Sequence, residues 1–201
     1  MEIKQTKPKM TLIKGKWLKL SRFNDFVKDT SIFPIKSPHN KHYSSSLNKD
    51  QTFYLNDLVD HLTKINRPLK CILDLSEGTH YTRDDLKAFN IEYKKVGIKG
   101  KSYPKESDLR EIFETISKYN SKNETICIHC KHGLNRTGYV IVSYLIKVKG
   151  IESEEAIKYF ERARGVRIEN KGYVESLLKM DKKERMNEGE AVSASSHSIQ
   201  N

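Results

Sequence analysis

Two side chains in the middle of the sequence, Cys130 and Arg136, have the spacing of a phosphate-binding site. Five residues separate them in the stretch HCKHGLNRTG, residues 129–138. A turn of this length lets successive backbone amides converge on a tetrahedral oxyanion, and a helix that follows adds its positive end. The planar guanidinium of Arg136 would bind two phosphate oxygens, and Cys130 would lie at the floor as a nucleophilic thiolate. The spacing therefore predicts phosphoryl transfer through cysteine.

The remaining residues of this stretch have supporting roles in the prediction. Gly133 suits a backbone conformation that other residues resist, His129 would orient the loop, and Thr137 would donate its hydroxyl to the sulfur during hydrolysis of a phosphocysteine. The catalytic set is thus Cys130, Arg136 and Thr137. The amides expected to bind phosphate belong to Lys131, His132, Gly133, Leu134, Asn135 and Arg136.

The pair Cys127 and Cys130 also allows a redox dithiol or, with His129 and His132, a metal cluster. A strand at Cys127 would place its Cα roughly 10 Å from that of Cys130, beyond the limit of about 7 Å for a disulfide. A four-ligand metal site normally needs a second pair of ligands, and the sequence shows none. Both alternatives are therefore weaker than phosphate chemistry, and no metal or other cofactor is expected.

The elements around this loop alternate between strand and helix patterns. Apolar runs predict strands at 71–75, 91–96 and 125–129, and helical spacing predicts helices at 53–65, from Pro104 through 116, and from Ser153, its N-cap, onwards. Residues 139–148 are apolar nearly all round, which predicts a buried helix directly after the loop, and a last helix is expected at about 173–179. The fold class is therefore α/β, with a central, mostly parallel sheet flanked by helices.

Length and charge narrow the choice of partner and of domain organisation. The 201 residues carry a net charge of +11, which favours an anionic partner such as nucleic acid or a phosphorylated small molecule. No apolar run approaches a membrane span, and the first residues lack the apolar region of a secretory signal. We expect a basic flexible arm at 1–16, a catalytic domain at 17–180 and a disordered tail at 181–201.

The loop resembles the signature of the cysteine-dependent protein tyrosine phosphatase superfamily. The longer stretch HCKHGLNRTGYVIVSYL is similar to its RNA 5′-triphosphatase branch, which includes the triphosphatase domain of capping enzymes and the RNA/RNP-complex-interacting phosphatase, an atypical dual-specificity phosphatase. His132 and Asn135 mark that branch. Further similarity lies at 33–38, 73–76, 93–100 and 160–173. The resemblance implies the cysteine-phosphatase fold and in-line attack by Cys130 on the γ-phosphorus of 5′-triphosphate RNA, without a metal.

This sequence departs from the branch at several positions. Lys131 replaces the usual Thr, the connection at 78–85 differs, and Asn170 stands where the branch usually has Arg, with Lys171 as a candidate substitute. The residues proposed to contact RNA or polyphosphate are Lys94, Lys95, Lys99, Arg164 and Lys171, with Lys101 as a further basic neighbour. A K-x-D-G motif of guanylyltransferases is missing, so a complete capping enzyme is not expected.

The segment at 96–104 separates the candidate substrates. Ordinary tyrosine and dual-specificity phosphatases carry an Asp general acid there, whereas this segment has no carboxylate. A phosphoanhydride leaving group departs without a proton, so the sequence favours an RNA 5′-polyphosphatase that removes the γ- and also the β-phosphate. The alternatives are a dual-specificity protein phosphatase, an inositol-phosphate or phosphoinositide phosphatase and a non-catalytic RNA-binding module. We expect a monomer that does not bind membranes, acts with ribonucleoprotein or RNA-processing partners, and lies in the nucleus rather than the cytoplasm.

Overall fold

The computed structural model describes residues 15–39, 52–78, 81 and 83–180. It contains four strands that form one parallel sheet in the order β1-β4-β2-β3. The α/β class and the parallel sheet are therefore as the alternating pattern predicted. The predicted arm and tail lie outside the described residues, except for Gly15 and Lys16, which cap and begin the first helix. The strands are β1 (Ile32–Pro34), β2 (Leu69–Asp74), β3 (Glu92–Lys95) and β4 (Thr125–His129).

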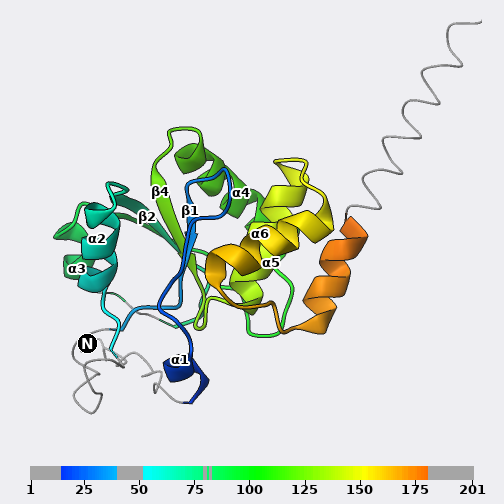
Figure 1. The fold of residues 1–201 in the computed structure, drawn as a ribbon, viewed down its shortest axis with the longest axis horizontal. Helices are drawn as coiled ribbons and strands as arrows, with labels where there is room; N and C mark the ends of the chain where they lie inside the picture. The colour runs from blue at the N-terminus through cyan, green and yellow to red at the C-terminus, as the bar shows by residue number, and fades with distance from the viewer. Residues whose placement is uncertain (1–14, 40–51, 79–80, 82, 181–201) are drawn as a thin grey trace, which may run out of the picture.

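Helices cover both faces of the sheet, as Figure 1 shows. On one face α1 and α2 pack with β1 around Phe33, Phe53 and Leu58. On the other face the core is formed mainly by α4, α5, α6 and a last helix at 171–180. The helices are α1 (Lys16–Lys19), α2 (Leu55–Lys64), α3 (Arg83–Lys87), α4 (Glu106–Asn120), α5 (Asn135–Lys147) and α6 (Ser153–Arg164). None of the described helices has the length and apolar character needed to cross a bilayer.

The central strand and the helix after it are the most deeply buried parts of the fold. All five residues of β4 are buried, as are the residues of α5 from 137 to 146. A strand with neighbours on both sides and helices on both faces has no exposed side, which explains its continuous apolar run. Both elements were predicted, and β4 has the predicted bounds.

The predicted helix starts differ from the observed ones by one to four residues, and two of these differences are explained at the helix cap. The helix expected to open at Pro104 begins at Glu106, because the carboxylate of Asp108 accepts a hydrogen bond from the Lys105 amide at 3.1 Å and so defines the cap there. Ser153 was expected to be an N-cap, but Glu152 has that position and Ser153 is the first helical residue.

Candidate active site

The predicted phosphate-binding loop lies between β4 and α5, at the carboxyl edge of the sheet. The segments that follow the other strands reach the same edge: Ile35 donates its amide to Ile128 of β4, and Leu75 donates its amide to His129. In an open parallel sheet this edge is where ligands bind. The topology therefore brings three connecting segments, far apart in sequence, against one loop.

Gly133 is required by both conformation and space. Its φ is +66°, in the left-handed region, and a Cβ there would lie 2.1 Å from the carbonyl oxygen of Ile35. Any side chain would push the loop away from the segment after β1. The loop can therefore pack against β1 only with glycine at this position.

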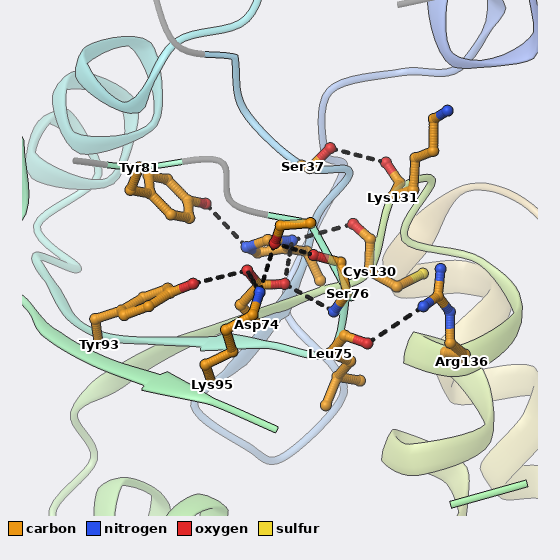
Figure 2. A network of polar contacts seen from close by, with 12 residues as sticks. Ser37, Asp74, Leu75, Ser76, Tyr81, Tyr93, Lys95, Cys130, Lys131 and Arg136 are labelled. Atoms are coloured by element: carbon orange, nitrogen blue, oxygen red, sulfur yellow. Dashed lines mark hydrogen bonds and ion pairs between the residues drawn. The ribbon is translucent and has the colours of Figure 1, made fainter. Parts of the chain in front are cut away.

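The segment after β1 also holds the start of the loop. Ser37 donates from both its amide and its hydroxyl to the carbonyl oxygen of Lys131, at 3.2 and 3.0 Å. Figure 2 shows the Lys131 side chain leaving this contact away from the buried residues. Because the carbonyl is fixed on the Ser37 side, the peptide that joins Lys131 to His132 has one orientation.

Arg164 is buried behind the loop, so the prediction that it contacts RNA was wrong. Its side chain is fully covered, and its guanidinium donates to the carbonyl oxygens of Gly133 and His132, both at 3.2 Å, and to Ser21. Burial lowers the pKa of Arg164 to about 10, and the negative charge of Cys130 acts against that change. We conclude that Arg164 positions the loop from behind and does not reach substrate.

Lys36 is a second buried cation near the loop. Its ammonium donates to the carbonyls of Trp17 and Leu20 and lies 3.5 Å from the centroid of the Trp17 ring. Burial, followed by repulsion from Arg164 and Arg22, lowers the pKa of Lys36 to about 8. These contacts attach α1 to the segment that supports the loop.

Cys130 is 3% exposed and lies beside the guanidinium of Arg136, as Figure 2 shows. Burial by itself would raise the pKa of the thiol. The charge of Arg136, hydrogen bonds from the Thr137 hydroxyl and amide, and the amide of His132 outweigh burial and lower that pKa. Among the described residues Thr137 Oγ1 has no other hydrogen-bond partner, so this hydroxyl is available to the sulfur. The site thus favours a thiolate.

Arg136 is held by two backbone carbonyls. Its Nη1 donates to Ile98 at 2.7 Å and to Leu75 at 3.4 Å, which connects α5 to the segments after β3 and β2. One edge of the guanidinium is occupied in this way, and the other donors remain for phosphate oxygens. The structure therefore brings Cys130, Arg136 and Thr137 together as predicted.

His129 belongs to a buried polar network with Tyr81 and Asp74, two of the residues labelled in Figure 2. Its Nδ1 lies 3.0 Å from the Cys130 carbonyl and its Nε2 lies 2.9 Å from the Tyr81 hydroxyl. Burial lowers the pKa of His129, which favours the neutral ring. Since a carbonyl can only accept, the proton lies on Nδ1, and Tyr81 donates to Nε2. His129 thus orients the backbone at Cys130.

Asp74, the last residue of β2, is the anion of this network and was missed in the sequence. It is fully buried and accepts hydrogen bonds from the Ser76 amide, the Tyr93 hydroxyl and the Lys95 ammonium, at 2.8, 2.8 and 3.0 Å. Tyr93 and Lys95 bind Oδ2, whereas Oδ1, which accepts from the Ser76 amide, also lies 3.6 Å from His129 Nδ1. The sign that could have revealed it is a carboxylate at the end of an otherwise apolar strand, which must be paired when buried.

The five basic residues predicted to contact RNA have different positions. Lys95 was assigned wrongly, because its ammonium is bound to Asp74 and to the carbonyl of Gly78. Lys94 forms an ion pair with Glu111 on α4. Lys99 and Lys171 are exposed and form no ion pair with a described carboxylate. Of the five, Lys99 and Lys171 are therefore the two that are exposed and outside an ion pair with a described carboxylate.

Asn135 and Asn170 hold the segment before the last helix through side-chain oxygens that accept hydrogen bonds from backbone amides. The side-chain oxygen of Asn135 accepts from the amides of Glu169 and Asn170, both at 2.9 Å, and that of Asn170 accepts from the Tyr173 amide at 3.3 Å. Asn170 therefore caps the helix at 171–180. Leu134 is 1% exposed, so it can contribute only its backbone to a ligand.

The cysteine pair does not form a disulfide. Cys127 is in β4 and packs on the face of α1 and α2, whereas Cys130 packs with the core on the opposite face. Burial, followed by the charge of Cys71, raises the pKa of Cys127. The two thiols therefore have opposite environments, and only Cys130 is activated.

Comparisons with known proteins agree with this site. The family model "Dual specificity phosphatase, catalytic domain" matches residues 53–183. The chain is 34% identical over 175 residues to the probable tyrosine-protein phosphatase pir-2 of Caenorhabditis elegans, covering 84% of this chain and 49% of that one. It is 31% identical over 170 residues to the RNA/RNP complex-1-interacting phosphatase of Rattus norvegicus, covering 83% and 52%. It thus spans about half the length of these two relatives.

A solved structure supports the fold. The crystal structure of PTPMT1 in complex with PI(5)P superimposes with a TM-score of 0.61 at 16% identity, covering 81% of this chain and 96% of that one. At this identity the match shows a shared architecture only. The predicted cysteine-phosphatase fold is confirmed.

Proposed function

We propose that this chain, which belongs to the dual specificity phosphatase family, removes the γ- and then the β-phosphate from RNA with a 5′-triphosphate. Cys130 Sγ attacks the terminal phosphorus in line, the sulfur–phosphorus bond forms, and the bridging oxygen leaves with RNA 5′-diphosphate. Water then attacks the phosphocysteine and releases phosphate. Arg136 and the loop amides stabilise the charge on the transferred group in both steps.

The observation that carries the proposal is that the segment next to Arg136 contains no carboxylate to act as a proton donor. The segment between β3 and α4 touches Arg136 through Ile98 and contains no carboxylate. Asp108, which follows it, caps α4, and Asp74 accepts hydrogen bonds in the buried network. A serine alkoxide needs a proton when it leaves, an aid of about 10²–10⁴ in rate, whereas a di- or monophosphate does not.

The exposed charge supports the same substrate. Lys99 and Lys101 lie on the segment that touches Arg136, and Lys171 begins the helix whose connection Asn135 holds. A polyphosphate and the RNA backbone present negative charges on both sides of the reacting phosphorus, so basic residues at the rim assist binding in a salt-dependent way.

A second candidate is hydrolysis of phosphotyrosine in proteins, which the name of the pir-2 relative favours. A phenolate leaves more easily than a serine alkoxide and depends less on a general acid, so the same segment permits it. The inositol-phosphate alternative rests on Lys131 and the basic surface, but buried Leu134 offers no second cation in the loop. The name of the rat relative suggests a ribonucleoprotein partner and, with it, a nuclear location, which we include in the proposal.

The test uses triphosphorylated RNA in EDTA, with separation of 5′-tri-, di- and monophosphate products. A phosphotyrosine peptide, a phosphoserine peptide and an inositol phosphate are run beside it, and Cys130→Ser is the inactive control. We expect release of two phosphates from RNA by the native chain alone. Rapid hydrolysis of a control substrate without any RNA product would mean that the site is a phosphatase with another substrate.

Glu77 provides a sharper check of the leaving-group argument. Its carboxylate accepts from the Gly100 amide at 3.1 Å, so it is the acidic side chain joined to the segment next to Arg136. Glu77→Gln should change the rate on triphosphate RNA less than threefold. A loss of about 10²-fold or more would identify Glu77 as a general acid and remove the main support for the proposal.

A further inference from the structure

Tyr103 is an exposed aromatic side chain beside the active site. It is 50% exposed, and the other large apolar side chains with comparable exposure in the described residues are Ile65 and Val148. Ile65 follows the end of α2 and Val148 follows the end of α5, away from the loop. Tyr103 instead lies in the segment between β3 and α4. An exposed ring at the rim of a site has a face available to a ligand.

The ring of Tyr103 is held in place by two buried tyrosines. Its centroid lies 5.5 Å from that of Tyr139 in an edge-on arrangement and 5.2 Å from that of Tyr173. Tyr173 also donates its hydroxyl to the carbonyl of Ser102 at 2.5 Å. A Cβ at Gly172 would lie 3.2 Å from the Tyr103 hydroxyl, so glycine there lets the ring approach the last helix. The ring therefore loses little freedom when it binds a ligand.

Contacts with the catalytic residues place this ring next to the phosphate loop. The same segment accepts from Arg136 at Ile98, and Tyr139 lies one helical turn after Arg136 on α5. The charges of Arg136 and Cys130 both act on the hydroxyl of Tyr173. Tyr103 therefore lies at the rim and not in the floor, where the substrate beyond the transferred phosphate must pass.

Exposed lysines flank Tyr103. Lys99 and Lys101 precede it in the same segment, and Lys171 precedes Gly172. None of them forms an ion pair with a described carboxylate. Aromatic side chains next to basic ones form the usual surface for single-stranded nucleic acid, where a base stacks and the phosphates meet the charges.

We propose that Tyr103 is the stacking platform for the first nucleobase of the RNA substrate, with Lys99, Lys101 and Lys171 bound to the adjoining phosphates. This inference rests on the proposed function, since it assigns a place to the part of the substrate that does not react. Stacking on an aromatic ring does not depend on a particular base. Hydrolysis should therefore tolerate any first base and should weaken when the base is removed.

The experiment compares two substrates, a triphosphorylated RNA trinucleotide and ribose 5′-triphosphate, which has no base. Tyr103→Ala should raise KM for the trinucleotide relative to the native chain. This increase should be about 5- to 100-fold larger than the increase in KM for ribose 5′-triphosphate. Tyr103→Ala should change kcat for both by less than threefold. Tyr103→Phe and Tyr103→Trp keep an aromatic ring and should have the native KM for both substrates. Val148→Ala, at an apolar site of similar exposure away from the loop, should also have the native KM for both.

The outcomes separate failure of the platform from failure of the proposed function. If the native chain hydrolyses the trinucleotide and Tyr103→Ala raises both KM values equally, or neither, Tyr103 does not stack on a base. If the native chain hydrolyses a phosphotyrosine peptide but not the trinucleotide, the proposed function is wrong, and the platform with it. Thermal unfolding of each variant is measured as a control, to check that the KM values come from folded protein.

Discussion

The residues behind the phosphate loop and those on its exposed rim are organised differently. Behind the loop, Arg164, His129 and Asp74 are fully buried, and each makes several polar contacts. On the rim, Lys99 and Tyr103 are exposed, and neither side chain forms a hydrogen bond or ion pair with a described residue. A buried polar group has one low-energy arrangement, whereas an exposed one can adapt. The buried side therefore preserves the geometry of phosphoryl transfer, and the rim is where substrate choice can vary.

The largest expected effect is that of Gly133→Ala. The left-handed backbone and the overlap with Ile35 should together cost about 3 kcal/mol of unfolding free energy, and kcat should fall by more than 100-fold. Urea unfolding and hydrolysis of p-nitrophenyl phosphate measure the two effects. Gly150→Ala is the matched control, since Gly150 also has φ of +66° but nothing within 4 Å of a Cβ. Equal losses in the two variants would contradict the steric argument.

The next effect is that of Arg164→Met. It leaves the carbonyls of His132 and Gly133 without their donors, so we expect a loss of about 2–3 kcal/mol in unfolding free energy. The kcat should fall about tenfold or more, while KM changes less, because the loop loses its orientation. Arg162→Met, on the exposed side of α6, is the control and should behave as the native chain. If Arg164→Met raised KM for RNA but left kcat and the unfolding free energy unchanged, a direct contact between Arg164 and RNA would be the better explanation.

Thr137→Val should shift a pH profile. The hydroxyl stabilises the thiolate, so its removal raises the pKa of Cys130, and a larger share of the thiol stays protonated at low pH. Alkylation of Cys130 by iodoacetamide should therefore move to higher pH by about one unit, becoming slower at pH 6 and unchanged at pH 10. Ser143→Ala, elsewhere on α5, serves as control. An unshifted profile would mean that Arg136 and the amides suffice.

The smallest effects distinguish two lysines four residues apart. Lys95→Met removes a partner of buried Asp74 and should lower the unfolding free energy by about 1 kcal/mol. Lys99→Met should leave the unfolding free energy unchanged and raise KM for RNA about two- to threefold. The slope of log KM against log salt concentration should fall by about one, the value expected for the loss of one phosphate contact. Urea unfolding and a salt titration of KM test the pair. If Lys95→Met changed KM and its salt slope while Lys99→Met lowered the unfolding free energy, both lysines would have been assigned the wrong role.

Prediction from the sequence succeeded where local pattern and fold agree. The strand at 125–129, the loop and the buried helix follow each other along the chain, so their order and spacing are visible without any distant partner. The assignments of Lys95 and Arg164 failed because a basic residue is usually exposed, and a sequence does not show which ones meet a buried carboxylate or carbonyl. Asp74 and Ser37 were missed for the same reason, since both act through neighbours more than 50 residues away.

The residue types that predict the chemistry are visible in the sequence: a cysteine and an arginine in one loop, a glycine between them, a hydroxyl after them and no carboxylate at 96–104. These depend on residue type and short spacing, which are properties of the chain before it folds. Only the folded protein shows which cations support the loop, which of them face solvent, and that Tyr103 packs on Tyr139 and Tyr173 at the rim. Burial and hydrogen bonding between distant segments arise only when parallel strands bring their carboxyl ends to one edge.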